Sequence, residues 1–552
     1  MMRRRSAVLV GCAVVAAGLR PAAARSLVDV GPPGKHFKLT AQAHVAAETF
    51  KSGRPVVGTS YFYWYDVYTG AHLRNPDGTD ALTNHPPEQA MADLSYRSAA
   101  WHYGQLRDVR QAGIDFIMPV FWGFPGDYQG WSFVGLPPLV EAHDRMLAEH
   151  DRDPSNPLPP KIGMFYDTST LKHNAGLGPK SLHVDLTTPD GHDWFYVTIR
   201  DFFSMVPPEK WARIDGRPIV FLYAASFAAK VDDTILEDTR RRFRADFGTD
   251  FFLVRHADWP GQADAWYQWG GATGLTLGDC VAGIGPGYDD SAVPGRGPLV
   301  VPRRNGRFYE EQWERLLKLQ SSRRPWIAHV ETWNEWHEGT DVARSQAWGT
   351  QYMALTARYA DQFRAGVRLP LAGPYVHAER VRWAGQVVGG LQLLPSRGDG
   401  CWEAQLIDGS HAVVTIPGPE SHAGRYLYFD VDDSYLYDEV DRVVELTAAF
   451  RDDGKCTRFR VEYDNNDPQA GVVLGAFRPS GWVNVGNTGT WRTVKLQLPD
   501  VRFTNRAHSA DFRLIADGAD RRLTIREVLV RKLPGTLTRP ASAPASTGGT
   551  SE

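Results

Sequence analysis

Cysteine is scarce in this chain, with four residues among 552, and one of them, Cys12, lies in the N-terminal segment. So few cysteines do not form the disulfide framework of a small secreted domain, and no Cys-x-x-Cys pair offers a zinc site. Cys401 and Cys456 lie in one later segment and could pair in an oxidising compartment, which would leave Cys280 as a buried thiol.

An excess of charge of one sign is also missing, because 61 basic and 64 acidic side chains give a formal net charge of −3. This balance argues against a nucleic-acid partner. No apolar run beyond the N-terminus reaches 18 residues, so we expect no transmembrane segment. The sequence also lacks the Gly-x-Ser-x-Gly and dinucleotide-binding glycine patterns, which disfavours those two enzyme classes.

Aromatic residues, in contrast, are abundant: 12% of the chain, including 18 Trp. Fourteen of the Trp lie between Trp64 and Trp348. Indole rings stack on the C–H faces of sugars, but they also fill hydrophobic cores. The excess therefore belongs to the first part of the chain and makes carbohydrate binding one of its candidate functions.

The N-terminus has the pattern of a signal peptide. Three arginines, Arg3 to Arg5, precede an apolar stretch at 6–19, and the small residues 22–24 form a cleavage site. We therefore expect residues 1–24 to be removed and the protein to be exported to the periplasm or the extracellular space. A lipid anchor at Cys12 is a weaker alternative, because only a short apolar run precedes it.

Short apolar runs alternate with helical patterns from about residue 55 to 365, which predicts a parallel sheet with crossover helices. The length and the missing glycine fingerprint favour a (β/α)8 TIM barrel within residues 25–370. Apolar and polar residues then alternate with period two in 371–534, predicting an antiparallel, jelly-roll-like β-sandwich that could bind carbohydrate. Residues 535–552 are rich in Pro, Ala, Ser, Thr and Gly and predict a disordered tail.

The strongest chemical signal follows the apolar run that starts at Trp326. There the sequence WNEWHEGT, residues 333–340, places Glu335 and Glu338 among Trp, Asn and His side chains, at the end of a predicted barrel strand. Active sites of such barrels lie at the carboxyl ends of the strands, and glycoside hydrolysis needs two carboxyl groups. We therefore interpret Glu335 and Glu338 as the catalytic pair. A surface turn with two solvated carboxylates is the alternative.

This eight-residue run resembles the signature of glycoside hydrolase family 99, the endo-α-mannosidase family. Weaker similarities occur in the same order along the barrel, over about 290 residues, in segments 60–65, 112–123, 213–218, 285–290 and 303–309. The resemblance implies a retaining, metal-independent hydrolase of α-mannosidic linkages. It further implies that Glu335 acts as a base on the sugar 2-hydroxyl and that Glu338 is the general acid and then the base for water.

The same resemblance assigns the substrate-binding residues. It places Tyr65, Trp122, Tyr288 and either Arg303 or Arg304 around the sugar. The signature itself adds Trp333, Asn334, Trp336 and His337, and Glu331 is an unusual third carboxylate beside it. Asp167 stands near the place where the family usually has a Glu, and could orient a hydroxyl or cap a loop. These departures suggest a divergent branch whose sugar need not be mannose.

Other polar groups give weaker signals. We expect no metal in the barrel, because His-Glu-x-x-His is absent. The oxygen-rich turns 430–433 and 464–467 could hold Ca²⁺ in the sandwich or be plain turns. Residues 255–259, together with Asp264, Trp266 and Trp269, could form a sugar platform or bury aromatics under the barrel rim.

Together these features predict an exported glycoside hydrolase that cleaves a polysaccharide or glycan internally, with an α-mannoside as the favoured substrate. A carbohydrate-binding protein without turnover is the first alternative, and a structural surface protein is the second.

Overall fold

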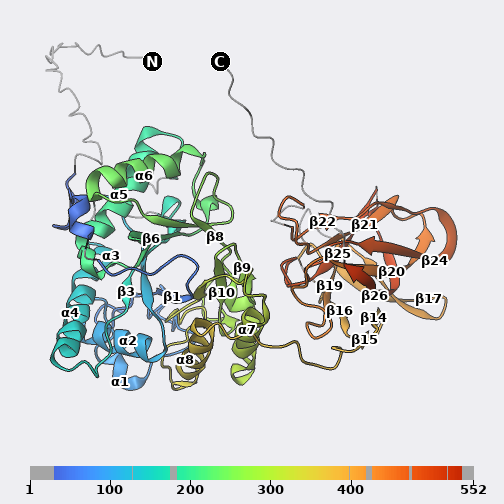
Figure 1. The fold of residues 1–552 in the computed structure, drawn as a ribbon, viewed down its shortest axis with the longest axis horizontal. Helices are drawn as coiled ribbons and strands as arrows, with labels where there is room; N and C mark the ends of the chain where they lie inside the picture. The colour runs from blue at the N-terminus through green and yellow to red at the C-terminus, as the bar shows by residue number, and fades with distance from the viewer. Residues whose placement is uncertain are drawn as a thin grey trace, which may run out of the picture.

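The computed structural model describes residues 30–45, 47–126, 128–173, 183–396, 398–417, 426–470, 475–518 and 520–536. The expected signal peptide, with Cys12, and most of the expected tail lie outside these residues. Figure 1 shows a barrel built by the first two thirds of the chain and a separate β-rich part built by the last third.

Eight parallel strands form the barrel among the described residues. In chain order they are β1 (Val56–Tyr61), β2 (Phe116–Phe121), β4 (Met164–Tyr166), β6 (Arg217–Leu222), β7 (Phe252–His256), β8 (Ala265–Tyr267), β10 (Val281–Ile284) and β13 (Ile327–Val330). Neighbours in the sheet are also neighbours in this order, and β13 returns to pair with β1 through Val56 and Ile327. This arrangement confirms the TIM-barrel prediction.

Between β8 and β10 the ladder is replaced by other contacts. The short strand β9 (Thr276–Leu277) pairs with β10 in antiparallel fashion, and the Thr276 hydroxyl donates to the Gln268 carbonyl over 2.9 Å. The remaining barrel strands are short: β3 (Lys161–Ile162), β5 (Arg213–Ile214), and the pair β11 (Tyr288–Asp289) and β12 (Val300–Val301). The barrel is therefore nearly closed, with its seam at β8.

Six long helices cover the outside of the barrel in the described part of the chain: α2 (Ala99–Gln111), α4 (Leu136–Arg152), α5 (Pro189–Met205), α6 (Thr234–Phe247), α7 (Arg307–Lys318) and α8 (Gln351–Arg364). Two four-residue helices, α1 (Glu88–Met91) and α3 (Trp131–Val134), lie in loops. The Ser98 hydroxyl caps α2 by accepting from Trp101 N over 3.2 Å. The predicted alternation of strands and helices thus holds except at β7, β8 and β10, which follow one another without an α-helix in the described residues between them.

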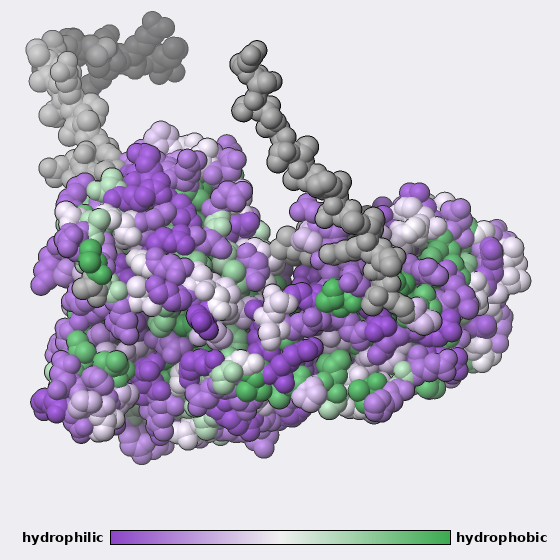
Figure 2. All heavy atoms as spheres, viewed as in Figure 1, coloured by the Kyte–Doolittle hydropathy of each residue, from purple (hydrophilic) through white to green (hydrophobic). Residues whose placement is uncertain are grey.

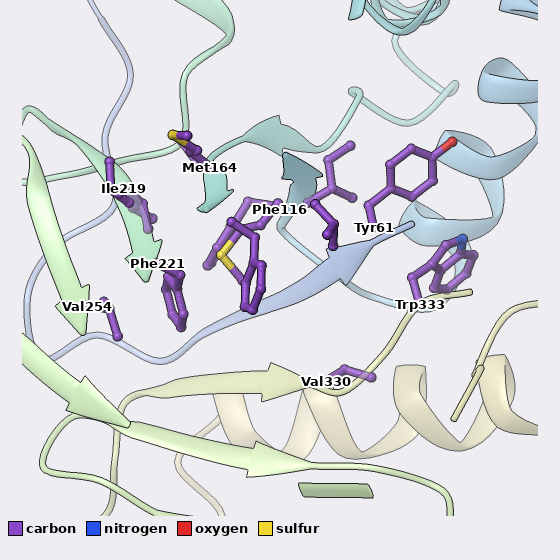
Figure 3. Close-up of a cluster of buried hydrophobic side chains, with 14 of the residues drawn as sticks. Tyr61, Phe116, Met164, Ile219, Phe221, Val254, Val330 and Trp333 are labelled. Atoms are coloured by element: carbon purple, nitrogen blue, oxygen red, sulfur yellow. The ribbon is translucent and has the colours of Figure 1, made fainter. Parts of the chain in front are cut away.

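The barrel interior is a packed core. Figure 3 shows a cluster of buried side chains on neighbouring barrel strands, among them Phe116, Met164, Ile219, Phe221, Val254 and Val330. All six side chains are fully buried apart from traces. Layers of large side chains fill TIM barrels in this way, so chemistry belongs at the strand ends.

Two antiparallel sheets form the rest of the described chain. The first contains β14 (Arg380–Ala384), β15 (Val387–Gly389), β17 (Trp402–Ile407), β18 (Ser410–Thr415), β20 (Arg442–Asp453), β24 (Asn487–Leu498) and β26 (Thr524–Thr536). The second contains β16 (Leu391–Leu393), β19 (Tyr426–Val431), β21 (Arg458–Tyr463), β22 (Arg478–Pro479), β23 (Val483–Asn484) and β25 (Phe512–Asp517). One hydrophobic core includes residues from both sheets, including Leu446 and Phe459, as expected for a sandwich.

The proposed disulfide is wrong. Cys401 and Cys456 are both buried free thiols, and Cys280 is a half-buried free thiol. The two oxygen-rich turns bind arginines: Asp433 pairs with Arg315 over 2.8 Å, and Asp464 with Arg506 over 2.6 Å. Throughout the described segments, no group of three or more His, Cys, Asp or Glu side chains is placed to hold a metal ion.

Candidate active site

The site begins where β13 ends, and a buried hydrogen-bond pair fixes its backbone. The Asn334 amide donates to the Phe62 carbonyl over 2.7 Å and accepts from Phe62 N over 2.8 Å. Trp333 N donates to the Ser60 carbonyl over 2.9 Å. The loop after β13 is therefore tied to the end of β1, because the strands pair in the parallel register that brings these ends together.

Glu335 faces His337 within this loop. Its Oε1 atom accepts from His337 N over 3.0 Å and lies 2.8 Å from His337 Nδ1. The other imidazole nitrogen, Nε2, lies 2.8 Å from the carbonyl oxygen of His72. Burial lowers the pKa of His337, but the Glu335 carboxylate and these hydrogen bonds outweigh it and raise the pKa overall. Because both nitrogens face acceptors, the ring donates twice when it is protonated.

Glu338 lies on the same turn and meets a cation. Its Oε1 atom accepts from Arg296 Nη1 over 2.6 Å, and Arg296 also reaches Asp290 over 3.4 Å. Burial, together with the charge of Glu335, raises the pKa of Glu338, while Arg296 and Tyr288 partly oppose that rise. Glu338 thus keeps its proton to higher pH than an ordinary glutamate.

Both carboxylates line a cavity of about 400 Å³. Its other walls are Trp64, His72, Arg74, Asn75, Ala81, Trp122, Val293, Pro294, Arg296 and His337. The Trp64 ring stacks on His72 with centroids 4.6 Å apart, and Trp122 crosses it edge-on at 5.5 Å. Trp122 Nε1 donates to Asp167 Oδ2 over 2.5 Å, and burial raises the pKa of Asp167. The cavity therefore combines aromatic walls with two carboxyl groups.

Several predicted site residues do not line the cavity but contact the turn that carries its two glutamates. Tyr65, Trp333, Asn334 and Trp336 are buried. The Tyr65 hydroxyl donates to the Asn334 carbonyl and accepts from Trp336 N, both over 3.1 Å. Trp333 Nε1 donates to Gln105 over 2.8 Å. These side chains fix the turn that carries both glutamates.

The other predicted residues differ in their distance from the cavity. Tyr288 lies at its rim, with its hydroxyl 3.1 Å from Arg296 Nη1. Arg303 holds Asp341 and the Gly339 carbonyl, so it braces the turn. Arg304 instead pairs with Glu311 at the surface. Glu331 is fully buried and is not among the cavity walls; it accepts from Gly270 N and Gly271 N over 2.8 Å each. Burial raises the pKa of Glu331 to about 8, partly opposed by these two donors.

Eight wall residues were not among the predicted contacts: Trp64, His72, Arg74, Asn75, Ala81, Val293, Pro294 and Arg296. Trp64 stands in the segment 60–65, so its neighbour Tyr65 could have pointed to it. Arg296 lies in the sequence PGRGP, and an arginine in a loop rich in Gly and Pro is the sequence feature that could have indicated a functional residue. No local sequence pattern identifies His72 as a cavity residue.

A larger cavity of about 850 Å³ runs along α2 on the outside of the barrel. Its Asp108 is bound by Arg344 through two hydrogen bonds of 3.0 and 3.1 Å. Figure 2 shows a mainly hydrophilic surface, with hydrophobic residues scattered over both parts of the molecule. In the described residues, no helix has the length and apolar character that crossing a bilayer requires.

The chain matches one protein family and is similar to several known proteins. A family model described as "Domain of unknown function (DUF5010)" matches residues 45–372. A glycoprotein endo-alpha-1,2-mannosidase-like protein of Danio rerio is 35% identical over 98 residues, which are 15% of this chain and 21% of that protein. The human counterpart is 30% identical over a segment of the same length. The chain thus spans about a fifth of the length of the curated relatives it matches.

Among solved structures, the GH99 endo-alpha-mannosidase from Bacteroides thetaiotaomicron is 17% identical, with a TM-score of 0.38, over 56% of this chain and 98% of that chain. The CBM22-1 xylan-binding domain from Paenibacillus barcinonensis Xyn10C is 13% identical, with a TM-score of 0.21, over 30% of this chain and 100% of that domain.

Proposed function

Because this chain belongs to the DUF5010 family, whose name carries no activity, we propose its function from the site: it is a glycoside hydrolase. The observation that carries the proposal is the placement of Glu335 and Glu338 in one aromatic-walled cavity at the carboxyl end of the barrel. The similarity to endo-alpha-1,2-mannosidase-like proteins supports it and favours an α-mannoside as substrate.

Glu338 is the proton donor in this proposal. Burial raises its pKa, so it holds a proton that it can give to the glycosidic oxygen as the C–O bond breaks. Water then adds to the sugar carbon and returns a proton to Glu338, so that the enzyme is regenerated. No other group on the same turn combines a raised carboxyl pKa with direct access to the cavity.

Glu335 assists the sugar from its fixed position beside His337. Its Oε1 atom is held by two donors, whereas Oε2 has no hydrogen-bond partner among the described residues. A carboxylate oxygen that is buried and unpaired can accept a proton from a substrate hydroxyl. We assign Glu335 this role of base. As Glu338 protonates the leaving oxygen, the sugar 2-hydroxyl gives its proton to Glu335 and its oxygen bonds to the anomeric carbon, which forms an anhydro-sugar. Water then opens this ring at the anomeric carbon, Glu335 returns its proton to the 2-oxygen, and the two successive displacements give retention of configuration.

The cavity walls suit a sugar ring. Trp64 and Trp122 offer indole surface for C–H faces, Asp167 holds the Trp122 ring in place, and Glu335 offers an acceptor for hydroxyls. We further propose that the protein acts on the interior of a glycan and works after export, with the sandwich as an additional carbohydrate-binding part.

The test is turnover of the full chain on a panel of α-mannans and other bacterial and plant polysaccharides. We expect oligosaccharide release that falls by about 10²–10⁴-fold in Glu335→Gln and in Glu338→Gln, as is typical when acid–base catalysis is lost. Glu237→Gln, an exposed change on α6, is the matched control and should leave turnover unchanged. Wild-type turnover in either site variant would exclude this pair.

A further inference from the structure

A second cavity lies between the barrel and the sandwich. It has a volume of about 340 Å³, and its walls come from the loops after β7 and β8 and from the segment 505–509 of the sandwich. The residues that matter here are His256, Gln268 and Trp269 on the barrel side, and Asn505, His508 and Ser509 on the sandwich side. In Figure 1 the barrel edge with β8 and β9 is the edge that faces the sandwich.

This cavity lies at the same end of the barrel as the candidate active site. Trp122, Tyr223 and Trp269 follow the ends of β2, β6 and β8, and all three are half-exposed. The Tyr223 and Trp269 rings are 5.4 Å apart. Tyr223 N donates to the Tyr166 carbonyl over 3.1 Å, directly beside Asp167, whose carboxylate accepts from Trp122. Aromatic surface therefore continues from one cavity toward the other.

The walls of the second cavity combine polar groups with apolar ones, such as Leu275 and Phe477, and carry little net charge. Burial lowers the pKa of His508, so its ring is neutral at pH 7. The Asp464 carboxylate neutralises Arg506, and Asp258 accepts from His256 Nδ1 over 2.7 Å. Asn505 is 8% exposed, and its Oδ1 atom has no hydrogen-bond partner among the described residues. Neutral amide and hydroxyl groups beside an indole ring match a neutral sugar better than an anion or an apolar ligand.

Buried contacts outside the cavity hold the barrel and the sandwich together. Asp438 is 1% exposed and accepts from Gln320 N over 2.8 Å, and it also pairs with Arg323 over 2.8 Å. Gly274 brings the barrel loop close to the sandwich, because a Cβ atom there would lie 3.9 Å from Ser509 Oγ. The cavity is thus a built feature of the folded chain.

We propose that this cavity is a sugar-binding subsite that barrel and sandwich form together, and that it holds a neutral sugar unit of a glycan whose reacting bond lies at Glu335 and Glu338. This inference rests on the proposed function and adds its substrate class: a chain long enough to reach from the barrel mouth to the sandwich. Trp269 supplies the stacking surface, and Gln268, Asn505 and His508 supply the hydrogen bonds.

The experiment measures binding of α-linked manno-oligosaccharides, from disaccharide to hexasaccharide, to full-length Glu338→Gln protein by calorimetry. His508→Asn removes the imidazole while keeping a residue that tolerates the positive φ of 55° at this position. We expect this change to weaken hexasaccharide binding about tenfold, as the loss of one or two hydrogen bonds does, and to leave disaccharide binding unchanged. Gln268→Ala is a second variant on the barrel side with the same expected result.

His411→Asn, an exposed change on β18, is the matched control and should alter neither affinity. If His508→Asn and Gln268→Ala bind every oligosaccharide as tightly as the Glu338→Gln protein does, while the native chain turns its substrate over, the shared subsite is overturned and the proposed hydrolase stands. Absence of both binding and turnover at every length would overturn the proposed function and this inference with it.

Discussion

At the scale of single residues, Glu335 and Glu338 differ in what they contact. Glu335 is held by the backbone and ring of His337, whose second nitrogen is fixed by the His72 carbonyl. Glu338 meets Arg296, which comes from a loop between β11 and β12 and is half-exposed. Two carboxylates three positions apart thus acquire different environments, which is how one site can hold an acid and a base at the same pH.

Arg296→Gln tests the environment of Glu338. The guanidinium favours the ionised carboxylate and so opposes the rise in the pKa of Glu338 that burial and Glu335 cause. A general acid works only while it is protonated, and activity is lost as pH rises through its pKa. Removing the cation raises that pKa further, so we expect the basic limb of the kcat/KM profile to move to higher pH.

The control for this profile is Arg304→Gln, because Arg304 pairs with Glu311 away from the cavity. It should leave the basic limb in place. A basic limb that stays fixed or moves to lower pH in Arg296→Gln would contradict the assignment of Glu338 as the acid.

At the scale of elements, the site depends on the join between the loop after β13 and the end of β1. Asn334 makes this join by pairing with both backbone groups of Phe62, and all four atoms are buried. Asn334→Ala leaves a buried N–H and a buried C=O without partners. At about 1–3 kcal/mol for each such group, we expect the free energy of unfolding to fall by about 3 kcal/mol.

Denaturant unfolding monitored by tryptophan fluorescence measures this change. Asn484→Ala, an exposed substitution on β23, should shift stability by less than about 0.5 kcal/mol. Equal midpoints for the two variants would show that Asn334 does not join these elements.

The sequence could predict the elements but only part of the site. Phe116–Phe121 and Ile327–Val330 are strands of a parallel sheet, and their short apolar runs between helical patterns identify them. The rule that chemistry lies at the strand ends of such a barrel then points to Glu335 and Glu338. His72 and Arg296 come from long loops, whose backbone follows tertiary contacts rather than a repeating pattern. The pairing of Cys401 and Cys456 depended on a distance that no spacing along the chain supplies.

At the scale of the whole molecule, the barrel and the sandwich are joined by charged groups that are largely withdrawn from water. Asp438 accepts from Arg323 and from Arg502 over 2.8 and 2.9 Å, and Arg315 of α7 pairs with Asp433 over 2.8 Å. Tyr437 packs into the hydrophobic core of the barrel although it belongs to the second part of the chain. Such contacts couple the folding of the two parts, since breaking them exposes unpaired charge inside an interface.

Asp438→Asn tests this coupling, because it keeps the shape of the side chain and removes the charge that both arginines share. Loss of one partner of a buried ion pair costs about 3 kcal/mol, so we expect calorimetric unfolding to separate into two transitions, one for each part. Lys495→Gln breaks an exposed pair with Glu445 and should leave the unfolding profile as it is in the native chain. A single transition at the native temperature in Asp438→Asn would mean that apolar contacts such as those of Tyr437 carry the coupling. The subsite between barrel and sandwich would then owe its geometry to packing rather than to charge.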